Sequence, residues 1–312
     1  MRRDQNDLWS RDWPAPAKIN LFLHVVGRRA DGYHLLQTVF RFLDFGDTLR
    51  FSPRTDGAVR LTTPLPGVPE ESDLTVRAAR KLQQAAAVTQ GVDIELIKRL
   101  PLGGGLGGGS SDAATVLLAL NALWQVGLSR LELQRLGLAL GADLPVFIHG
   151  RASFAEGVGE CFAAVDLPPA WYLVLVPPVT VATASIFAAP DLVRNTALIA
   201  ASQWRPELGG NDLEAVACRL FPEIARHLDL LRPYGRARMS GSGACVFVGF
   251  ATEQAAVAAL AQQPADVRGF VARGVDRHPL LECQEQIEMS GFVANEMSAF
   301  PSAWESGEGR SP

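Results

Sequence analysis

The apolar residues of the chain follow two patterns with different periods. Short apolar runs, and alternation of apolar with polar residues, are typical of strands, whereas apolar residues three or four positions apart are typical of helices. The predicted strands cover residues 19–26, 39–45, 48–51, 92–96, 171–176, 245–250 and 269–275. The predicted helices cover residues 73–88, 111–126, 130–140, 212–220, 222–231 and 252–263.

Single residues at the ends of these segments predict where some elements begin and stop. Asp44, Gly46 and Asp47 interrupt the apolar pattern between the predicted strands at 39–45 and 48–51. Ser72 can cap the helix that follows it, and Asp73 suits the positive end of the helix dipole. Pro145 is expected to keep residues 142–148 from extending the preceding helix.

The order of the elements predicts an α+β protein with two lobes. A domain usually contains about 100–200 residues, so a chain of 312 residues has room for two. We expect the boundary near residues 150–175. The predicted organisation is a polar N-terminal tail at 1–12, an N-terminal domain at 13–165, a C-terminal domain at 166–283 and a mobile tail at 284–312.

Composition and charge exclude several classes of function. The chain has 29 Lys and Arg against 33 Asp and Glu, a formal net charge of −4, so no nucleic-acid partner is expected. Residues 167–190 carry no charge, but prolines interrupt them, so we expect no membrane span and no membrane partner. The N-terminus does not resemble a signal peptide. The four cysteines are scattered, which fits a cytoplasmic protein without disulfides or a zinc site.

The strongest chemical signal is a glycine-rich run between a predicted strand and a predicted helix. Six of the seven residues 103–109 are glycine. Glycine has a high entropic cost in folded structure, so such a run fits a place where the backbone approaches a ligand closely. The next helix begins with unpaired N–H groups that attract phosphate. The phosphate-binding run is predicted to consist of Pro101, Leu102, Gly103, Gly104, Gly105, Leu106, Gly107, Gly108, Gly109, Ser110 and Ser111.

Other interpretations of this run fit less well. Ser110 and Ser111 could cap the helix or offer hydroxyls to a phosphate or a metal ion. A flexible linker does not belong between a strand and a strongly apolar helix. Gly103-x-Gly105-x-x-Gly108 also matches a dinucleotide fingerprint, but the strand and acidic residue expected about 20 residues later are missing. The motifs of ATPase P-loops and of protein kinases are absent too.

Lys18 and Asp143 are the candidate catalytic residues. Lys18 is one of only three lysines, with Lys81 and Lys98, beside 26 arginines. It lies at the start of an apolar strand, where a lysine can also simply keep its ammonium in solvent. Asp143 lies in an otherwise apolar segment, where it is either a cap or turn residue or a general base for a hydroxyl nucleophile.

A second glycine turn and three rings complete the set of candidates. The segment 240–244, Ser-Gly-Ser-Gly-Ala, is either an ordinary tight turn or a second loop closing on the same polyphosphate. Tyr33 and His34 follow a turn, and Phe187 lies in the uncharged stretch. These rings either pack in the core or stack on a base.

Taken together, these segments resemble the GHMP kinase superfamily, which includes galactokinase, homoserine kinase and mevalonate kinase. The three superfamily motifs occur in order at residues 16–21, 101–111 and 240–243. Residues 30–38, 141–147 and 154–160 are similar to one branch, whose substrate is a cytidine diphosphate ester of methylerythritol. The similarity extends from about residue 13 to 282.

The resemblance implies a bilobal kinase with ATP and substrate between the lobes. The implied reaction transfers the γ-phosphoryl group of ATP to the 2-hydroxyl of the cytidine diphosphate substrate, a step toward isoprenoid precursors by the non-mevalonate route. Asp143 is then the base and Lys18 its partner. Magnesium is expected with ATP, but no protein ligand for it is evident. The alternative is another member, of the homoserine or mevalonate type. A monomer or a homodimer is expected.

The resemblance also implies roles at the substrate end. Tyr33 and Phe187 are expected to sandwich the cytosine, and His34 to read its polar edge. Asn20 and Thr183 are expected to touch the substrate near the reacting group, and Gly241 and Ser242 to complete its site. Asp73 lies near the implied adenine pocket, where relatives often carry Asn, so adenine recognition is left open.

Overall fold

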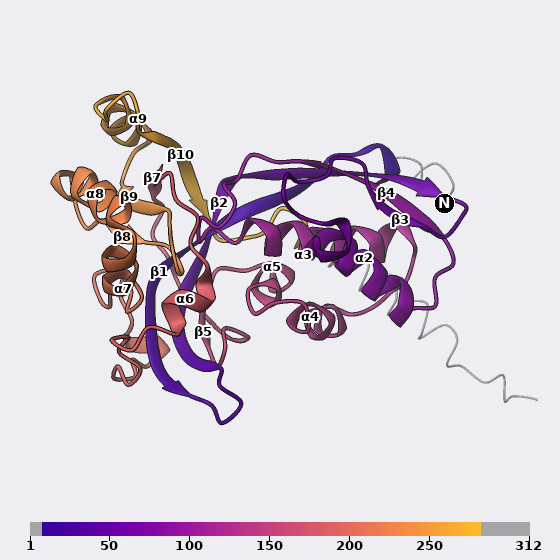
Figure 1. Cartoon of the computed structure of the whole chain (residues 1–312), viewed down its shortest axis with the longest axis horizontal. Coiled ribbons are helices and arrows are strands. Elements are labelled where there is room, and N and C mark those ends of the chain that lie inside the picture. Colours follow the sequence, from indigo (N-terminus) through magenta and orange to yellow (C-terminus); the bar gives the residue numbers. More distant parts are fainter. Residues whose placement is uncertain (1–7, 282–312) are drawn as a thin grey trace, which may run out of the picture.

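The computed structural model describes residues 8–281 and contains strands and helices in both halves (Figure 1). Residues 1–7 of the predicted N-terminal tail and the predicted tail at 284–312 lie outside the described residues. The strands are β1 (Trp13–Arg28), β2 (His34–Arg54), β3 (Val59–Leu61), β4 (Gly91–Ile97), β5 (Ser153–Glu156), β6 (Cys161–Ala164), β7 (Trp171–Val176), β8 (Arg238–Met239), β9 (Val246–Phe250) and β10 (Arg268–Val275). The α-helices are α2 (Leu74–Ala85), α3 (Gly108–Leu123), α4 (Arg130–Leu138), α5 (Leu144–His149), α6 (Thr183–Phe187), α7 (Glu214–Leu220), α8 (Pro222–Leu231) and α9 (Glu253–Ala261), with short 3₁₀ turns at Glu70–Ser72, Ala201–Gln203 and Arg232–Tyr234.

The strands join in one mixed sheet that extends through both halves of the molecule. Its main path runs β3-β4-β2-β10-β7-β9-β8, with β1 and β5 also pairing with β2. Strand β10 pairs antiparallel with both β2 and β7, so it connects the two halves. Helices α2, α3, α4 and α5 lie against one half of the sheet, and α7, α8 and α9 lie in the other (Figure 1). The predicted α+β class with two lobes is confirmed.

Strand β2 is longer than the sequence pattern predicted. The predicted strands at 39–45 and 48–51 form one strand, because β2 continues through residues 44–47 and Gly46 and Asp47 pair with β1. Pro16 faces Gly46 and Lys18 faces Phe42, so the irregularity in the pattern marks a bulge in the ladder and not its end. A Cβ on Gly46 would lie 2.2 Å from the carbonyl oxygen of Ala15. Glycine here permits a close strand contact.

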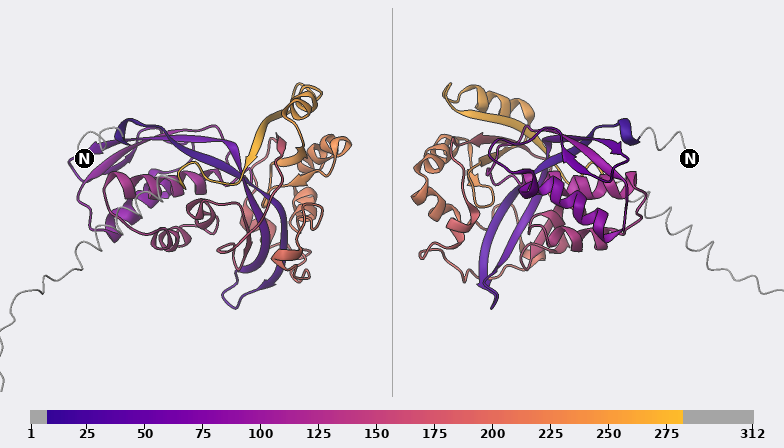
Figure 2. Two further views of the ribbon diagram at one scale, coloured as in Figure 1. Left: turned by 180° about the vertical axis from the view of Figure 1, so that it is seen from behind. Right: turned by 45° about the vertical axis from the view of Figure 1, so that its right-hand side comes forward.

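Three apolar clusters form the core of the molecule. The first lies between the sheet and helices α2 to α5, and includes Leu82, Leu117 and Phe147. The second surrounds α7 and α8 and includes Val25 from β1. The third contains Phe22 and lies where the two halves meet. Strand β1 contributes to all three clusters, and Figure 2 shows β1 and β2 as one long curved hairpin.

One predicted helix cap is corrected by the structure, and the predicted break before Pro145 is confirmed. Asp73, not Ser72, caps α2, because its Oδ1 accepts a hydrogen bond of 2.8 Å from the Thr75 backbone. Residues 142–148 do not extend the preceding helix, as predicted, because α4 ends at Leu138 and a separate helix, α5, follows at Leu144–His149. Pro145 does not disrupt this second helix. It lies in the first turn of α5, where a missing N–H costs nothing. A capping box opens α4, where Ser129 and Glu132 each accept a hydrogen bond from the other's backbone N–H.

Other local predictions agree with the described residues. Residues 171–176 form the buried strand β7, as predicted from the uncharged stretch. No helix found within residues 8–281 is both long enough and apolar enough to span a membrane. Leu8 and Trp9, from the predicted N-terminal tail, pack against the first apolar cluster.

Candidate active site

The predicted motifs meet in a cleft of about 550 Å³ between the two halves. Lys18 and Asn20 reach it from β1, and Asp143 reaches it from the start of α5. The opposite wall comes from α6 and from the turn between β8 and β9. The predicted site residues that line the cleft are Lys18, Asn20, Pro101, Leu102, Gly103, Gly104, Gly105, Gly107, Gly108, Gly109, Ser110, Asp143, Thr183, Phe187, Gly241 and Ser242.

The glycine run forms a loop that leads directly into helix α3. The helix begins at Gly108, inside the run, and not near residue 111 as the sequence pattern predicted. Its N-cap is Gly107, with a φ of 73°, and no side chain caps it. Gly103 and Gly105 also have positive φ values. The first N–H groups of a 16-residue helix are therefore open toward the cleft, an arrangement that attracts phosphate.

The two terminal serines of the run have different surroundings. Ser110 lines the cleft, so its hydroxyl remains available to a ligand. Ser111 is fully buried, and its hydroxyl donates to the carbonyl oxygen of Pro16 at 2.7 Å. The prediction that Ser111 offers a hydroxyl to phosphate, or caps the helix, is therefore wrong. Its backbone N–H donates to Gly107 within the helix.

The second glycine turn is bound tightly to the glycine run. The hydroxyl of Ser240 donates to the carbonyl oxygen of Gly105 at 2.9 Å, and the N–H of Cys245 donates to Gly104 at 3.0 Å. A Cβ on Gly105 would lie 2.1 Å from the carbonyl oxygen of Ser240. Glycine at 105 is thus required by close contact with the turn, as well as by its own positive φ of 72°.

Lys18 and Asp143 come together at the inner end of the cleft. The Nζ atom of Lys18 lies 3.3 Å from Oδ2 of Asp143 and donates to Oδ1 of Asn20 at 2.7 Å. Only 2 % of the Lys18 side chain is exposed, against 41 % of Asp143. The amide of Asn20 in turn donates to Thr38 at 2.9 Å. Asn20 therefore orients the ammonium, in addition to lining the cleft.

Local structure fixes both members of this pair. The backbone N–H of Lys18 donates to the carbonyl oxygen of Leu106 at 2.9 Å, which ties β1 to the glycine run. Asp143 is the N-cap residue of α5, yet its side chain accepts no capping hydrogen bond. Its carboxylate is therefore free of the structural role that a cap usually has, and it can accept a proton from a ligand in the cleft.

The rings at the far end of the cleft are only partly brought together. His34 packs on Phe187, with ring centroids 4.8 Å apart and planes at 31°. Tyr33 is 61 % exposed and lines a neighbouring cavity of about 280 Å³, which shares Ala142 and Val158 with the cleft. Thr183 and Ser242 share a hydrogen bond of 2.8 Å across the opposite wall.

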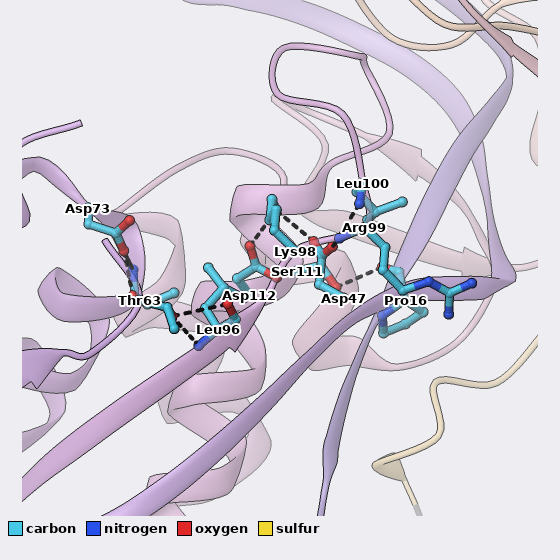
Figure 3. A network of polar contacts seen from close by, with 11 residues as sticks. Pro16, Asp47, Thr63, Asp73, Leu96, Lys98, Arg99, Leu100, Ser111 and Asp112 are labelled. Atoms are coloured by element: carbon cyan, nitrogen blue, oxygen red, sulfur yellow. Dashed lines mark hydrogen bonds and ion pairs between the residues drawn. The ribbon is translucent and has the colours of Figure 1, made fainter. Parts of the chain in front are cut away.

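A buried ionic network beneath the glycine run was not predicted from the sequence (Figure 3). Lys98 Nζ donates to Asp47 and to Asp112, each at 2.6 Å. The other oxygen of Asp47 accepts from the backbone N–H groups of Arg99 and Leu100, at 2.6 and 2.8 Å. The network thus fixes the chain just before the glycine run to the start of α3. The scarcity of lysine is a sequence signal that points to Lys98 as well as to Lys18.

The carboxyl of Asp112 has the most strongly shifted pKa of this network. Burial, with the adjacent charge of Asp47, raises the pKa of Asp112 to about 8, although Lys98 acts in the opposite direction. Its Oδ1 is buried without a hydrogen-bond partner. Burial is the largest single influence on the pKa of Lys98 and lowers it. Asp112 and Asp47 together outweigh burial, so the pKa of Lys98 is raised. Lys98 is therefore charged at neutral pH.

Two residues predicted near the nucleotide also have structural partners. Asp73 is buried and serves as the cap of α2, where its Oδ1 accepts hydrogen bonds from both the backbone and the hydroxyl of Thr75. Leu106 is almost fully buried, so it reaches the ligand side only through its backbone.

Comparison with known proteins agrees with this geometry. Residues 73–151 match the family model of the GHMP kinases N terminal domain, and residues 188–266 match that of the GHMP kinases C terminal. A crystal structure of 4-(cytidine 5'-diphospho)-2C-methyl-D-erythritol kinase is similar, with a TM-score of 0.67, 37 % identity, and coverage of 85 % of this chain and 99 % of that one. The Methanococcus jannaschii mevalonate kinase shares the fold, at a TM-score of 0.61 and 15 % identity, over 85 % of this chain and 98 % of that one.

Sequence relatives are considerably closer. The 4-diphosphocytidyl-2-C-methyl-D-erythritol kinase of Dechloromonas aromatica is 64 % identical over 86 % of this chain and 98 % of its own length. That of Nitrosospira multiformis is 58 % identical over 88 % of this chain and 94 % of its own.

The fold and the three converging motifs define a GHMP kinase, an ATP-dependent enzyme that phosphorylates a small molecule. Within that class, the chain belongs to the family of 4-diphosphocytidyl-2-C-methyl-D-erythritol kinases.

Proposed function

We propose that the chain transfers the γ-phosphoryl group of ATP to the 2-hydroxyl of 4-diphosphocytidyl-2-C-methyl-D-erythritol, with Asp143 as general base and Lys18 as its electrostatic partner. The observation that carries this proposal is the Lys18–Asp143 ion pair of 3.3 Å in the cleft that the glycine run lines. The high identity to kinases named for this substrate supports the choice of acceptor. The reaction belongs to the non-mevalonate route to isoprenoid precursors.

The proposed chemistry is an in-line displacement. The carboxylate of Asp143 accepts the proton of the 2-hydroxyl while the hydroxyl oxygen forms a bond to the γ-phosphorus. The bond between the γ-phosphorus and the oxygen bridging to the β-phosphate breaks, and ADP leaves with that electron pair. The exposure of Asp143 favours this role, since its carboxylate faces the cleft and not the core.

Lys18 supplies charge where negative charge develops. Its ammonium stabilises the attacking oxygen and the migrating phosphoryl group. Burial strengthens these interactions because little water remains around the ammonium. Asn20 holds Nζ in place, so the charge is positioned before the substrate binds.

Backbone groups are proposed to hold the phosphates of ATP. The open N-terminus of α3 and the glycine run offer N–H groups without the bulk of side chains. Magnesium would neutralise part of the phosphate charge, and the Ser110 hydroxyl is an oxygen donor placed to hold it. The described residues contain no cluster of three or more acidic, histidine or cysteine side chains that could bind a metal, so phosphate and water oxygens would complete the coordination.

The rings at the other end are proposed to hold the cytosine. Phe187 lines the cleft and offers a face for stacking, and Tyr33 stands at the adjoining cavity. Thr183, Gly241 and Ser242 line the wall between the rings and the glycine run, which suits contact with the diphosphate and methylerythritol groups.

We also propose that the chain is divided into domains at 13–165 and 166–283, and that it is located in the cytoplasm. The cytoplasmic location is supported by Cys161, Cys218 and Cys245, which are free thiols.

The experiment that tests the function is an assay of ADP release with three acceptors. The purified chain is supplied with MgATP and with the cytidine diphosphate substrate, homoserine or mevalonate. We expect turnover only with the first. Turnover with homoserine or mevalonate, and none with the cytidine substrate, would assign the chain to the alternative type of GHMP kinase.

A further inference from the structure

Arg194 contacts the ring that was predicted to read the base. Its Nε–H donates to Nε2 of His34 at 3.1 Å. The rest of the guanidinium is held by main-chain oxygens, because it donates to Phe187 at 2.9 Å, Ala189 at 2.7 Å and Leu192 at 2.9 Å. The group is therefore fixed in position, and its direction toward His34 is set by the chain around α6.

This contact determines which nitrogen of His34 carries the proton. A guanidinium cannot accept a hydrogen bond, so the Nε2 atom that it faces must present its lone pair. The imidazole is then neutral, and its single proton lies on Nδ1. Burial lowers the pKa of His34, as do the charges of Arg194 and Arg28, which agrees with a neutral ring at neutral pH.

The free nitrogen is thereby made a donor. Within residues 8–281, Nδ1 of His34 has no hydrogen-bond partner, and the ring packs on Phe187, which lines the cleft. Cytosine presents an unprotonated N3 to a donor, whereas uracil presents N3–H at the same place. A donor at Nδ1 therefore pairs with cytosine and meets a second donor on uracil, an arrangement that leaves polar groups unpaired.

We propose that Arg194 is a positioning residue for base selection: by donating to Nε2 of His34 it keeps Nδ1 protonated, and Nδ1–H selects N3 of cytosine over N3–H of uracil. This inference rests on the proposed function, because it concerns the base of the proposed substrate. Arg194 itself does not touch the base. It acts through the protonation of His34.

The test compares kcat/KM for the cytidine substrate with that for its uridine counterpart, measured as ADP release. Arg194→Met removes the hydrogen bond and keeps a long side chain. We expect the preference for cytidine to fall by about tenfold or more, with the KM for ATP unchanged. Arg28→Met is the matched control, because it removes another positive charge near His34 without removing the bond to Nε2. It should keep the preference.

A double variant separates this role from support of the α6 loop. In a His34→Ala background the preference is already reduced, and adding Arg194→Met should not lower it further. An unchanged preference in Arg194→Met, or a further loss in the double variant, would overturn the proposal. If the wild-type chain releases no ADP with the cytidine substrate, the proposed function itself fails.

A measurement on the wild-type protein covers the case in which Arg194→Met does not fold. Nitrogen-15 NMR of labelled histidine distinguishes the two neutral forms of the ring, and the His34 signals are assigned by their loss in His34→Ala. We expect the form protonated on Nδ1. A ring protonated on Nε2, or on both nitrogens, at neutral pH contradicts the proposal whatever the variants show.

Discussion

Lys18 and Lys98 line the same cleft beside the glycine run, and they differ in the carboxylates that surround their ammonium groups. Lys18 faces one carboxylate, Asp143, at 3.3 Å, and that carboxylate is 41 % exposed. Lys98 faces two carboxylates at 2.6 Å, and both are almost completely buried. The buried ammonium of Lys18 has one exposed partner, whereas the ammonium of Lys98, on a side chain that is 16 % exposed, is held between two buried partners.

With Lys18 in its proposed catalytic role, one residue type would serve chemistry at one place in the cleft and structure at another. A catalytic ammonium needs capacity left to stabilise new negative charge, and a single, longer ion pair leaves that capacity. The structural ammonium of Lys98 forms ion pairs with Asp47 of β2 and Asp112 of α3, so it links three segments of the chain. In the Lys98 network the surplus negative charge is relieved because the pKa of Asp112 rises to about 8.

The largest effect is expected from removing the exposed carboxylate of the first pair. Asp143→Asn should lower kcat by about 10³- to 10⁴-fold, because an amide cannot accept the hydroxyl proton. Binding of ATP and of the cytidine substrate, measured by calorimetry, should change little. Turnover within tenfold of the wild type would show that Asp143 is not the base.

Removing the ammonium of Lys18 should have the next largest effect. Lys18→Met should lower kcat by about 10²- to 10³-fold, since the developing charge loses its partner while the base remains. The melting temperature should fall less than it does in Lys98→Met. If the two lysine variants lost activity equally, the contrast between a catalytic and a structural lysine would not hold.

Lys98→Met should reduce the free energy of unfolding by about 2–3 kcal/mol, less than for a fully enclosed pair because the carboxyl of Asp112 can take up a proton. Urea denaturation at neutral pH measures this change. Adding Asp112→Asn to Lys98→Met should recover part of the loss, since it removes one of the two unpaired carboxyls. No recovery would argue against an electrostatic cause.

Asp112→Asn alone should have the smallest effect, and its sign depends on pH. The folded chain binds a proton at Asp112 up to about pH 8, whereas the unfolded chain loses it near the ordinary pKa of 3.8. The contribution of Asp112 to the wild-type free energy of unfolding is therefore fully present at low pH and is lost as the pH rises toward 8. The variant should be more stable by about 1 kcal/mol at pH 8, with little difference at pH 4. Urea midpoints at the two pH values measure this, and a larger gain at pH 4 would contradict it.

Sequence predicted the elements and the cleft correctly where local spacing and residue propensity favour a single structure. The glycine run, the strand carrying Lys18 and the helices at residues 222–231 and 252–263 follow from spacing and propensity, and the structure confirms them. The motifs also predicted that Lys18 and Asp143 would meet, although 125 positions separate them along the chain.

The errors share a physical cause, which is that tertiary contacts decided between two local possibilities. Asp44, Gly46 and Asp47 interrupt the apolar pattern, but pairing of Gly46 and Asp47 with β1 keeps the chain in one strand. Ser111 could cap a helix, but a buried carbonyl oxygen of Pro16 claims its hydroxyl. The Lys98 network could not be predicted because its members come from three separate segments, and no spacing along the chain relates them.

The long pairing of β1 with β2 has a consequence for how the chain can be divided. The first family match begins at residue 73 and the second at residue 188, so both begin after β1 and β2. Strand β1 nevertheless contributes to the apolar clusters of both halves. A gene fragment encoding only residues 166–281 would keep the pairing of β10 with β7, but it would lack Leu23 and Val25 of its own core and the pairing of β10 with β2. The later half expressed without strands β1 and β2 would therefore leave part of its apolar core uncovered.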